Sequence, residues 1–194
     1  MNKLLFITHP QVTVEPTKPV TEWSLSKEGR ARTARFSASP ALAKLGAIWS
    51  STETKALESA MILAQHLRLP VRQMSRLGEN DRSSTGYRER AEFERMANAF
   101  FGNPDESISG WETARAAQER IVGAVQEIVS QHQNGDLAIV SHGAVGTLLL
   151  CALCDLPISR RHDQPYQGHY WIANLQTLAI TQPWSPWEPH RRPT

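Results

Sequence analysis

The chain has 194 residues, which is long enough for one α/β domain with a buried core and too short for two, so we expect a single domain over residues 1–194. Its 40% hydrophobic and 21% charged residues argue against global disorder, and a formal net charge of +2 is too small to indicate a nucleic-acid or membrane partner. The apolar stretch before Thr8 is too short for a signal-peptide core, and two cysteines fit a reducing compartment, so we expect a cytoplasmic protein.

The first half of the chain alternates strand and helix patterns. A short apolar run predicts a buried strand at residues 2–7, and a loop containing Pro and Thr follows at 10–22. The later patterns predict a helix capped by Ser26 and ending near Ser37, a strand at 46–50, a helix at 54–67 and a short strand at 71–74. Residues 75–87 show no clear period.

The second half contains the two clearest helical patterns, at residues 88–101 and 111–132, with turn-forming residues between them. A strand from residue 135 to His142, a helix at 144–154 and one or two strands at 170–178 follow. The four prolines after residue 182 predict no regular element in a tail at 183–194. Strands that alternate with helices predict a mostly parallel, doubly wound sheet.

Cys151 and Cys154 have the spacing C-x-x-C, but they continue the apolar run of the predicted helix at 144–154. We therefore expect core cysteines rather than a redox turn. With no second cysteine pair, the sequence does not predict a structural zinc site.

Two histidines follow two buried strands: His9 comes after Thr8, and His142 comes after Ser141. Ligands of parallel α/β sheets bind beyond the carboxyl ends of the strands. If these two strands are neighbours, both imidazoles emerge in one crevice, although they are far apart in the sequence. Paired imidazoles at such a place indicate nucleophilic or acid/base chemistry.

Four features occur in order along nearly the whole chain. They are Thr8-His9-Pro10, the segment Ser-Ser-Thr-Glu-Thr-Lys-Ala-Leu-Glu-Ser-Ala at 50–60, an acidic site near Glu79, and Ser141-His142-Gly143. Together they resemble the histidine phosphatase superfamily, which is also called phosphoglycerate-mutase-like. The resemblance implies a three-layer α/β/α sandwich with a mostly parallel central sheet, and phosphoryl transfer through a phosphohistidine.

The resemblance also implies roles for single residues. His9 falls at the position of the nucleophile, and His142 falls at that of the second histidine, which lies against the transferring phosphoryl group. Glu79 is our candidate for the carboxyl group that protonates the leaving oxygen, with Asp81 as the reserve. Lys55 and Gly143 fall at phosphate-binding positions. The resemblance implies no metal and no other cofactor.

The sequence departs from the family pattern at three positions. Thr8 stands where the family has arginine, Pro10 where it has glycine, and Lys55 where it has a second arginine. Thr8 offers a hydroxyl group to phosphate but no charge, and Lys55 lacks the planar fork of a guanidinium. Three groups could compensate: Lys18, His169 and Arg82. We favour Arg82 as a phosphate-binding residue because it lies beside Glu79 in the sequence.

The resemblance predicts a phosphomonoester hydrolase whose partner is a small phosphorylated molecule or a phosphoprotein, chosen by the loops at 11–22 and 79–94. Two alternatives stay open: a phosphoglycerate-type mutase, and a weak or inactive relative that binds an anionic ligand or a protein. A homodimer also stays open. Basic residues do not alternate with aromatic ones along any strand, which argues against a nucleic-acid surface.

Overall fold

The centre of the molecule is a six-stranded sheet, in a computed structural model that describes residues 2–188. The strands lie in the order β3-β2-β4-β1-β5-β6. Neighbours from β3 to β1 pair parallel, whereas β5 pairs antiparallel with β1 and with β6, so the sheet is mostly parallel, as predicted. The strands are β1 (Lys3–Thr8), β2 (Leu45–Ser50), β3 (Val71–Gln73), β4 (Asp136–Ser141), β5 (His169–Asn174) and β6 (Ile180–Pro186).

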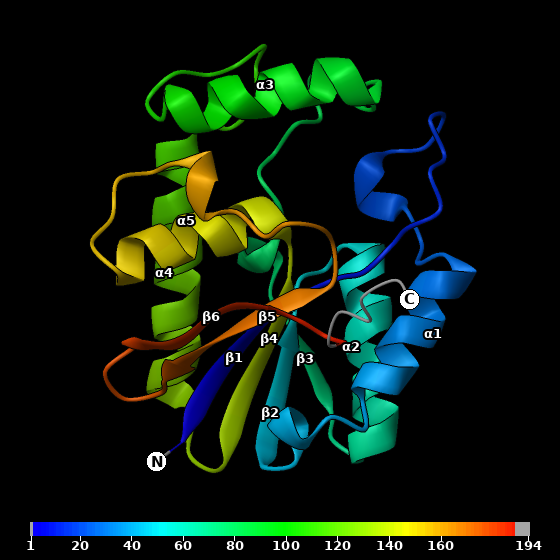
Figure 1. The fold of residues 1–194 in the computed structure, drawn as a ribbon, viewed down its shortest axis with the longest axis vertical. Helices are drawn as coiled ribbons and strands as arrows, with labels where there is room; N and C mark the ends of the chain where they lie inside the picture. The colour runs from blue at the N-terminus through cyan, green and yellow to red at the C-terminus, as the bar shows by residue number, and fades with distance from the viewer. Residues whose placement is uncertain (1, 189–194) are drawn as a thin grey trace, which may run out of the picture.

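Helices cover both faces of the sheet, which confirms the predicted three-layer α/β/α sandwich (Figure 1). Helices α1 and α2 lie on one face, α4 and α5 lie on the other, and α3 lies across the end toward which β1 runs. The helix at residues 54–67 has the predicted bounds, and the others differ from prediction by a few residues at their ends. The helices are α1 (Lys27–Phe36), α2 (Thr54–Leu67), α3 (Arg90–Gly102), α4 (Ala114–Gln131) and α5 (Gly143–Leu153).

Strands β1 and β4 are buried on both faces, which explains their continuous apolar sequences. Successive side chains of a strand point to opposite faces. Leu4 and Phe6 therefore pack in the core beneath α4 and α5, whereas Leu5 and Ile7 pack in the core beneath α1 and α2. The two cores fix the register of β1, because a slip by one residue would exchange the two sets of side chains.

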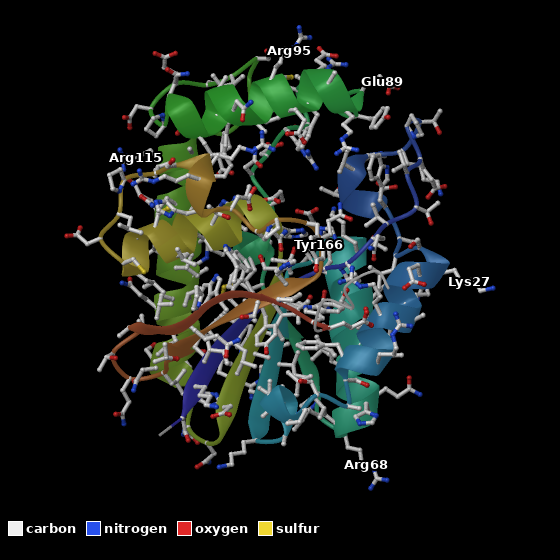
Figure 2. All side chains as sticks on the ribbon, viewed as in Figure 1. Lys27, Arg68, Glu89, Arg95, Arg115 and Tyr166 are labelled. Carbon is white, nitrogen blue, oxygen red and sulfur yellow. The ribbon has the colours of Figure 1, made fainter. Side chains whose placement is uncertain are left out.

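Side-chain caps set where two of the helices begin. Ser26 caps α1 as predicted, because its hydroxyl accepts a hydrogen bond from the Gly29 N–H. The Thr113 side chain accepts one from the Ala116 N–H, so α4 begins at Ala114 rather than at the predicted residue 111. Charged side chains occupy the outside: Lys27, Arg68, Glu89, Arg95 and Arg115 point away from the body in Figure 2.

The prediction that residues 183–194 lack regular structure is wrong for residues 183–186, because β6 continues to Pro186, and it is confirmed for residues 187–188. β6 is an edge strand that pairs only with β5, and an edge strand tolerates proline because one of its sides makes no ladder hydrogen bonds. Trp187 then packs in the core beside Phe36, with 4.7 Å between the ring centroids. The rest of the predicted tail, 189–194, lies outside the described residues.

The two cysteines differ in their surroundings. Cys151 is buried in α5, as predicted, but Cys154 is exposed, and the prediction of two core cysteines is wrong for it. Cys154 follows the last residue of α5, where the chain turns away from the core. In the described part of the chain, no helix is long and apolar enough to cross a membrane.

Candidate active site

The structure brings His9 and His142 together at one end of the sheet. Strands β1 and β4 are neighbours, Thr8 pairs with Ser141, and the His9 N–H donates to the Ser141 carbonyl at 3.2 Å. The two imidazole rings lie with their centroids 5.3 Å apart and their planes at 67°. Backbone pairing therefore places the two residues side by side at the ends of neighbouring strands.

The backbone selects one tautomer of His9. Its Nδ1 lies 2.8 Å from the Pro10 carbonyl oxygen, which can only accept a hydrogen bond. Nδ1 therefore carries the proton, and Nε2 carries the lone pair. Burial and then the positive charge of Lys55 lower the pKa of His9 from 6.5 to about 4. The ring is therefore neutral at pH 7, with a nucleophilic nitrogen available.

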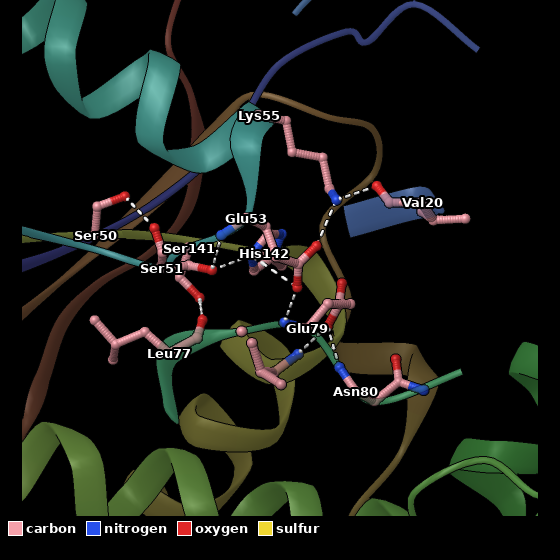
Figure 3. Close-up of polar contacts among 12 residues, drawn as sticks. Val20, Ser50, Ser51, Glu53, Lys55, Leu77, Glu79, Asn80, Ser141 and His142 are labelled. Atoms are coloured by element: carbon pink, nitrogen blue, oxygen red, sulfur yellow. Dashed lines mark hydrogen bonds and ion pairs between the residues drawn. The ribbon is translucent and has the colours of Figure 1, made fainter. Parts of the chain in front are cut away.

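His142 is fully buried, and only one of its ring nitrogens is engaged (Figure 3). Its Nε2 lies 2.9 Å from the Ser51 hydroxyl oxygen and 3.4 Å from Glu53 Oε1. Within residues 2–188, its Nδ1 has no hydrogen-bond partner. Burial lowers the pKa of His142 well below its usual value.

A buried ion pair between Glu53 and Lys55 lies beside His142 (Figure 3). Lys55 Nζ lies 2.5 Å from Glu53 Oε2 and also donates to the Val20 carbonyl at 2.8 Å. Burial opposes ionisation of Glu53, but its interactions with His142 and Lys55 outweigh burial and lower its pKa to about 2. Part of the charge of Lys55 is thus already balanced. Glu53 is not among the residues for which the sequence predicts a role.

The Glu79 carboxylate sits at the first turn of α5 (Figure 3). Its oxygens accept hydrogen bonds from the N–H groups of Ala144 at 3.2 Å and Val145 at 3.1 Å. Its own N–H donates to Glu53 Oε1 at 2.7 Å. Burial raises the pKa of Glu79 above its usual value, and this effect outweighs the positive charge of Arg82 and the hydrogen bonds from the Val145 and Ala144 N–H groups, which act in the opposite direction.

Asp81, the reserve candidate for the acid, is exposed. The Ser83 N–H donates to its carboxylate at 2.9 Å, and hydrogen bonds from Ser83 lower its pKa. A carboxyl group with a lowered pKa is ionised near neutral pH and has no proton to donate. Geometry and charge therefore both favour Glu79 over Asp81.

One cavity of about 200 Å³ joins five of the predicted site residues: His9, Lys55, Glu79, Arg82 and Gly143. Aromatic and small apolar side chains from α3 and its surroundings form one wall: Phe93, Ala97, Phe100, Phe101 and Trp111. The lining also contains polar residues to which the sequence analysis gave no role: Asn80, Arg160, Asp163, Gln164 and Gln167. Most of these belong to the segment between α5 and β5, whose sequence carries no motif.

Of the three groups considered as replacements for the missing arginine, the cavity contains only Arg82. Its guanidinium lies 4.9 Å from the ring centroid of Phe93, and it forms no ion pair within 4 Å in residues 2–188. Lys18 is exposed and pairs with Glu15 at 2.7 Å. His169 is buried in β5, outside the cavity lining.

Thr8 is fully buried and does not line the cavity. Its hydroxyl donates to Gln164 Oε1 at 2.6 Å, and it lies 3.1 Å from both the carbonyl oxygen and the N–H nitrogen of His169. The hydroxyl is therefore engaged by the protein, and the direct contact with phosphate that we expected for Thr8 stays a prediction.

The sequence model of the histidine phosphatase superfamily (branch 1) matches residues 4–173. The chain belongs to the histidine phosphatase superfamily. The match includes both site histidines, the Glu53–Lys55 pair and Glu79. In the part of the chain that the structure describes, no group of three or more His, Cys, Asp or Glu side chains is arranged to hold a metal ion.

Solved structures share the fold of this chain. A mycobacterial glucosyl-3-phosphoglycerate phosphatase has a TM-score of 0.79 and 18% identity over 96% of this chain and 98% of that one. For YhfR from Bacillus stearothermophilus the TM-score is 0.77 and the identity 24%, over 94% and 95% of the two chains. A histidine-to-alanine variant of phosphoserine phosphatase from Entamoeba histolytica, in complex with phosphoserine, has a TM-score of 0.77 and 16% identity over 97% and 98%. No curated protein sequence matches the chain significantly.

Proposed function

We propose that this member of the histidine phosphatase superfamily hydrolyses phosphomonoesters through a phosphohistidine formed on His9. The observation that carries the proposal is the state of the His9 ring. The Pro10 carbonyl holds the proton on Nδ1, and a pKa of about 4 keeps the ring neutral at pH 7. Nε2 therefore has a free lone pair in a ring that borders the same cavity as Glu79, Arg82 and Lys55.

In the first step, the lone pair of His9 Nε2 forms a bond to phosphorus while the bond from phosphorus to the ester oxygen breaks. The electron pair of that bond goes to the ester oxygen, which takes the proton held by Glu79 and leaves as an alcohol. The raised pKa of Glu79 supports this role, because a general acid must hold a proton before it can donate one. The positive charge that develops on the phosphorylated ring is stabilised by the Pro10 carbonyl at Nδ1.

In the second step, a water oxygen attacks phosphorus and gives a proton to the Glu79 carboxylate. The N–P bond breaks, its electron pair returns to His9 Nε2, and inorganic phosphate leaves. Every atom is balanced without a redox partner, and the proposal needs no metal ion.

Fixed donors around the phosphoryl oxygens are the main catalytic device in such a transfer. His142 supplies one, since Nε2 is engaged by Ser51 and Nδ1, when protonated, is a donor without a partner in the described structure. Arg82 supplies a second, since its guanidinium lines the cavity and forms no ion pair within 4 Å in residues 2–188. Lys55 supplies a further positive charge at the cavity wall.

The size of the cavity favours a small phosphorylated molecule over a phosphoprotein as the substrate. Its volume of about 200 Å³ lies below the roughly 300–1,000 Å³ that is usual for ligand sites. Two proteins of the same fold, a glucosyl-3-phosphoglycerate phosphatase and a phosphoserine phosphatase, are named for small phosphomonoesters, which supports the same choice.

The experiment that tests the proposal compares wild type with His9→Ala and with His66→Ala, an exposed histidine of α2 that serves as the matched control. Each protein is incubated with an aryl phosphate, and phosphate release is measured. Samples made with a ³²P-labelled phosphomonoester are denatured at alkaline pH and analysed for acid-labile phosphate on the protein. We expect release and labelling in wild type and His66→Ala, and neither in His9→Ala.

Three other results would contradict the proposal. Equal rates for wild type and His9→Ala would remove His9 from the mechanism. Phosphate binding without turnover of a broad panel of phosphomonoesters would indicate an anion-binding relative. Isomerisation of a phosphorylated substrate in excess over phosphate release would indicate a mutase.

A further inference from the structure

The Thr8 hydroxyl anchors a side chain from the far end of the chain. It donates to Gln164 Oε1 at 2.6 Å, a contact between β1 and the segment that joins α5 to β5. Thr8 itself is fully buried, whereas Gln164 lines the cavity that contains His9. Thr8, which lies outside the cavity, thus holds the side-chain amide of Gln164, which lines it.

The anchor determines which end of the amide is free. Because Oε1 is taken by the Thr8 hydroxyl, the Nε2 group points elsewhere, and within residues 2–188 it makes no hydrogen bond. Its direction is shown by Gly143, where a Cβ atom would lie only 2.6 Å from Gln164 Nε2. The amide nitrogen therefore lies over the first residue of α5, directly after His142.

Two of the cations that line the cavity are already paired with carboxylates. Lys55 is paired with Glu53 at 2.5 Å, and Arg160 is paired with Glu94 at 2.6 Å. The Gln164 amide can supply hydrogen bonds that these paired cations leave unmade, because its N–H₂ group offers two N–H donors to phosphate oxygens.

We propose that the Gln164 amide binds the phosphoryl group through Nε2, and that Thr8 is a positioning residue that acts through it. This inference rests on the proposed function, since it concerns the same phosphate. The inference explains how an uncharged residue can serve at position 8. The Thr8 hydroxyl does not contact the phosphate itself but holds the Gln164 amide that does. Gly143 is required to be small because a side chain there would displace the amide.

The experiment measures the affinity for inorganic phosphate by calorimetry, which needs no turnover. Gln164→Leu should weaken binding about 10- to 100-fold, the loss typical of one hydrogen bond to a charged group. Thr8→Val should weaken it by no more than Gln164→Leu, and the double variant should bind no more weakly than Gln164→Leu alone. Thr8→Ser keeps the hydroxyl group and should bind like wild type.

The pH dependence of phosphate binding by Gln164→Glu separates a direct contact with phosphate from a purely structural role of Gln164. The substitution places a carboxylate oxygen where the Nε2 donor was, so affinity should be lost near pH 7 and should recover as the pH falls and the new carboxyl group takes a proton. Wild type and Gln164→Leu should not show this recovery. Thermal unfolding of each variant checks that the fold is intact.

Unchanged phosphate affinity in Gln164→Leu would overturn the inference, and so would additive losses in the double variant. Wild type that binds no phosphate would overturn it together with the proposed function. Wild type that binds phosphate and loses affinity in the Gln164 variants, but releases no phosphate from esters, would support the inference and refute only the hydrolase.

Discussion

Replacing Glu79 by glutamine tests the assignment of the general acid with little change of shape. An amide oxygen at the Oε1 position keeps the hydrogen bonds from the Val145 and Asn80 N–H groups, and only the bond from the Ala144 N–H to Oε2 is lost. The expected cost in stability is about 1 kcal/mol. The expected cost in catalysis is far larger, since loss of general acid–base help lowers rates by about 10²- to 10⁴-fold, or roughly 3 to 5 kcal/mol in activation free energy.

The loss should depend on the leaving group. Without a proton from Glu79, the leaving group of an alkyl phosphate is a strongly basic alkoxide. The rate at which Glu79→Gln hydrolyses an alkyl phosphate should therefore fall by the full factor. The leaving group of nitrophenyl phosphate is a stable phenolate that needs no proton, so the rate of attack by His9 on this substrate should fall much less. Because the variant also lacks a base for the attacking water, it should release nitrophenol in a burst and accumulate phosphohistidine.

Stopped-flow absorbance measures the burst, and protein-bound ³²P measures the intermediate. Asp81→Asn is the matched control, because Asp81 is a neighbouring exposed carboxylate and should leave both rates unchanged. Equal reductions for the two substrates, without a burst or an accumulated intermediate, would refute the reasoning that gives Glu79 the proton.

The remaining predictions concern pH and stability. Because the pKa of His9 is lowered to about 4, protonation of His9 should lower kcat/KM only as the pH approaches 4. A fall in kcat/KM with a midpoint near pH 6.5 that persists when each other histidine is replaced would contradict this prediction. Lys55→Met leaves the Glu53 carboxylate buried without its partner and should lower the free energy of unfolding by about 3 to 5 kcal/mol, whereas exposed Lys27→Met should not; equal denaturation midpoints would disprove it. The pKa of Glu53 is lowered from 4.5 to about 2, so its stabilising effect is present above pH 4.5, and the deficit of Lys55→Met should shrink as the pH falls from 4.5 towards 2. Ile139→Ala in the fully buried centre of β4 should cost about 2 to 5 kcal/mol in urea denaturation, and a loss below 1 kcal/mol would show that the site collapses around the deletion.

The sequence predicted those parts of the fold that depend on local patterns. The apolar period of α2 gave its bounds, and the continuous apolar runs of β1 and β4 gave two strands buried on both faces. The prolines of β6 misled the prediction because their effect depends on whether a strand lies at an edge, and this is a property of the whole sheet.

Prediction of the site was limited in the same way. His9 and His142 could be paired because each directly follows a strand, and strand order then decides their distance. Glu53 was not predicted as a site residue because its contacts with His142 and Lys55 form only when α2 packs beside β4. The link from Thr8 to Gln164 joins residues 156 positions apart, in a segment without a sequence motif, and only coordinates reveal it.

The pairing of β1 with β4 has a consequence for how such a protein can be altered. The spacing between the two positions that carry the imidazoles belongs to a backbone ladder inside the sheet, whereas much of the cavity wall comes from α3 and from residues 160–167. The segment at 79–94 contributes to the wall and to the proposed reaction, because Phe93, Glu79 and Arg82 lie in it. Substitutions in α3 that reshape the wall therefore offer a way to change which molecules enter the cavity while the two histidines stay at the ends of neighbouring strands.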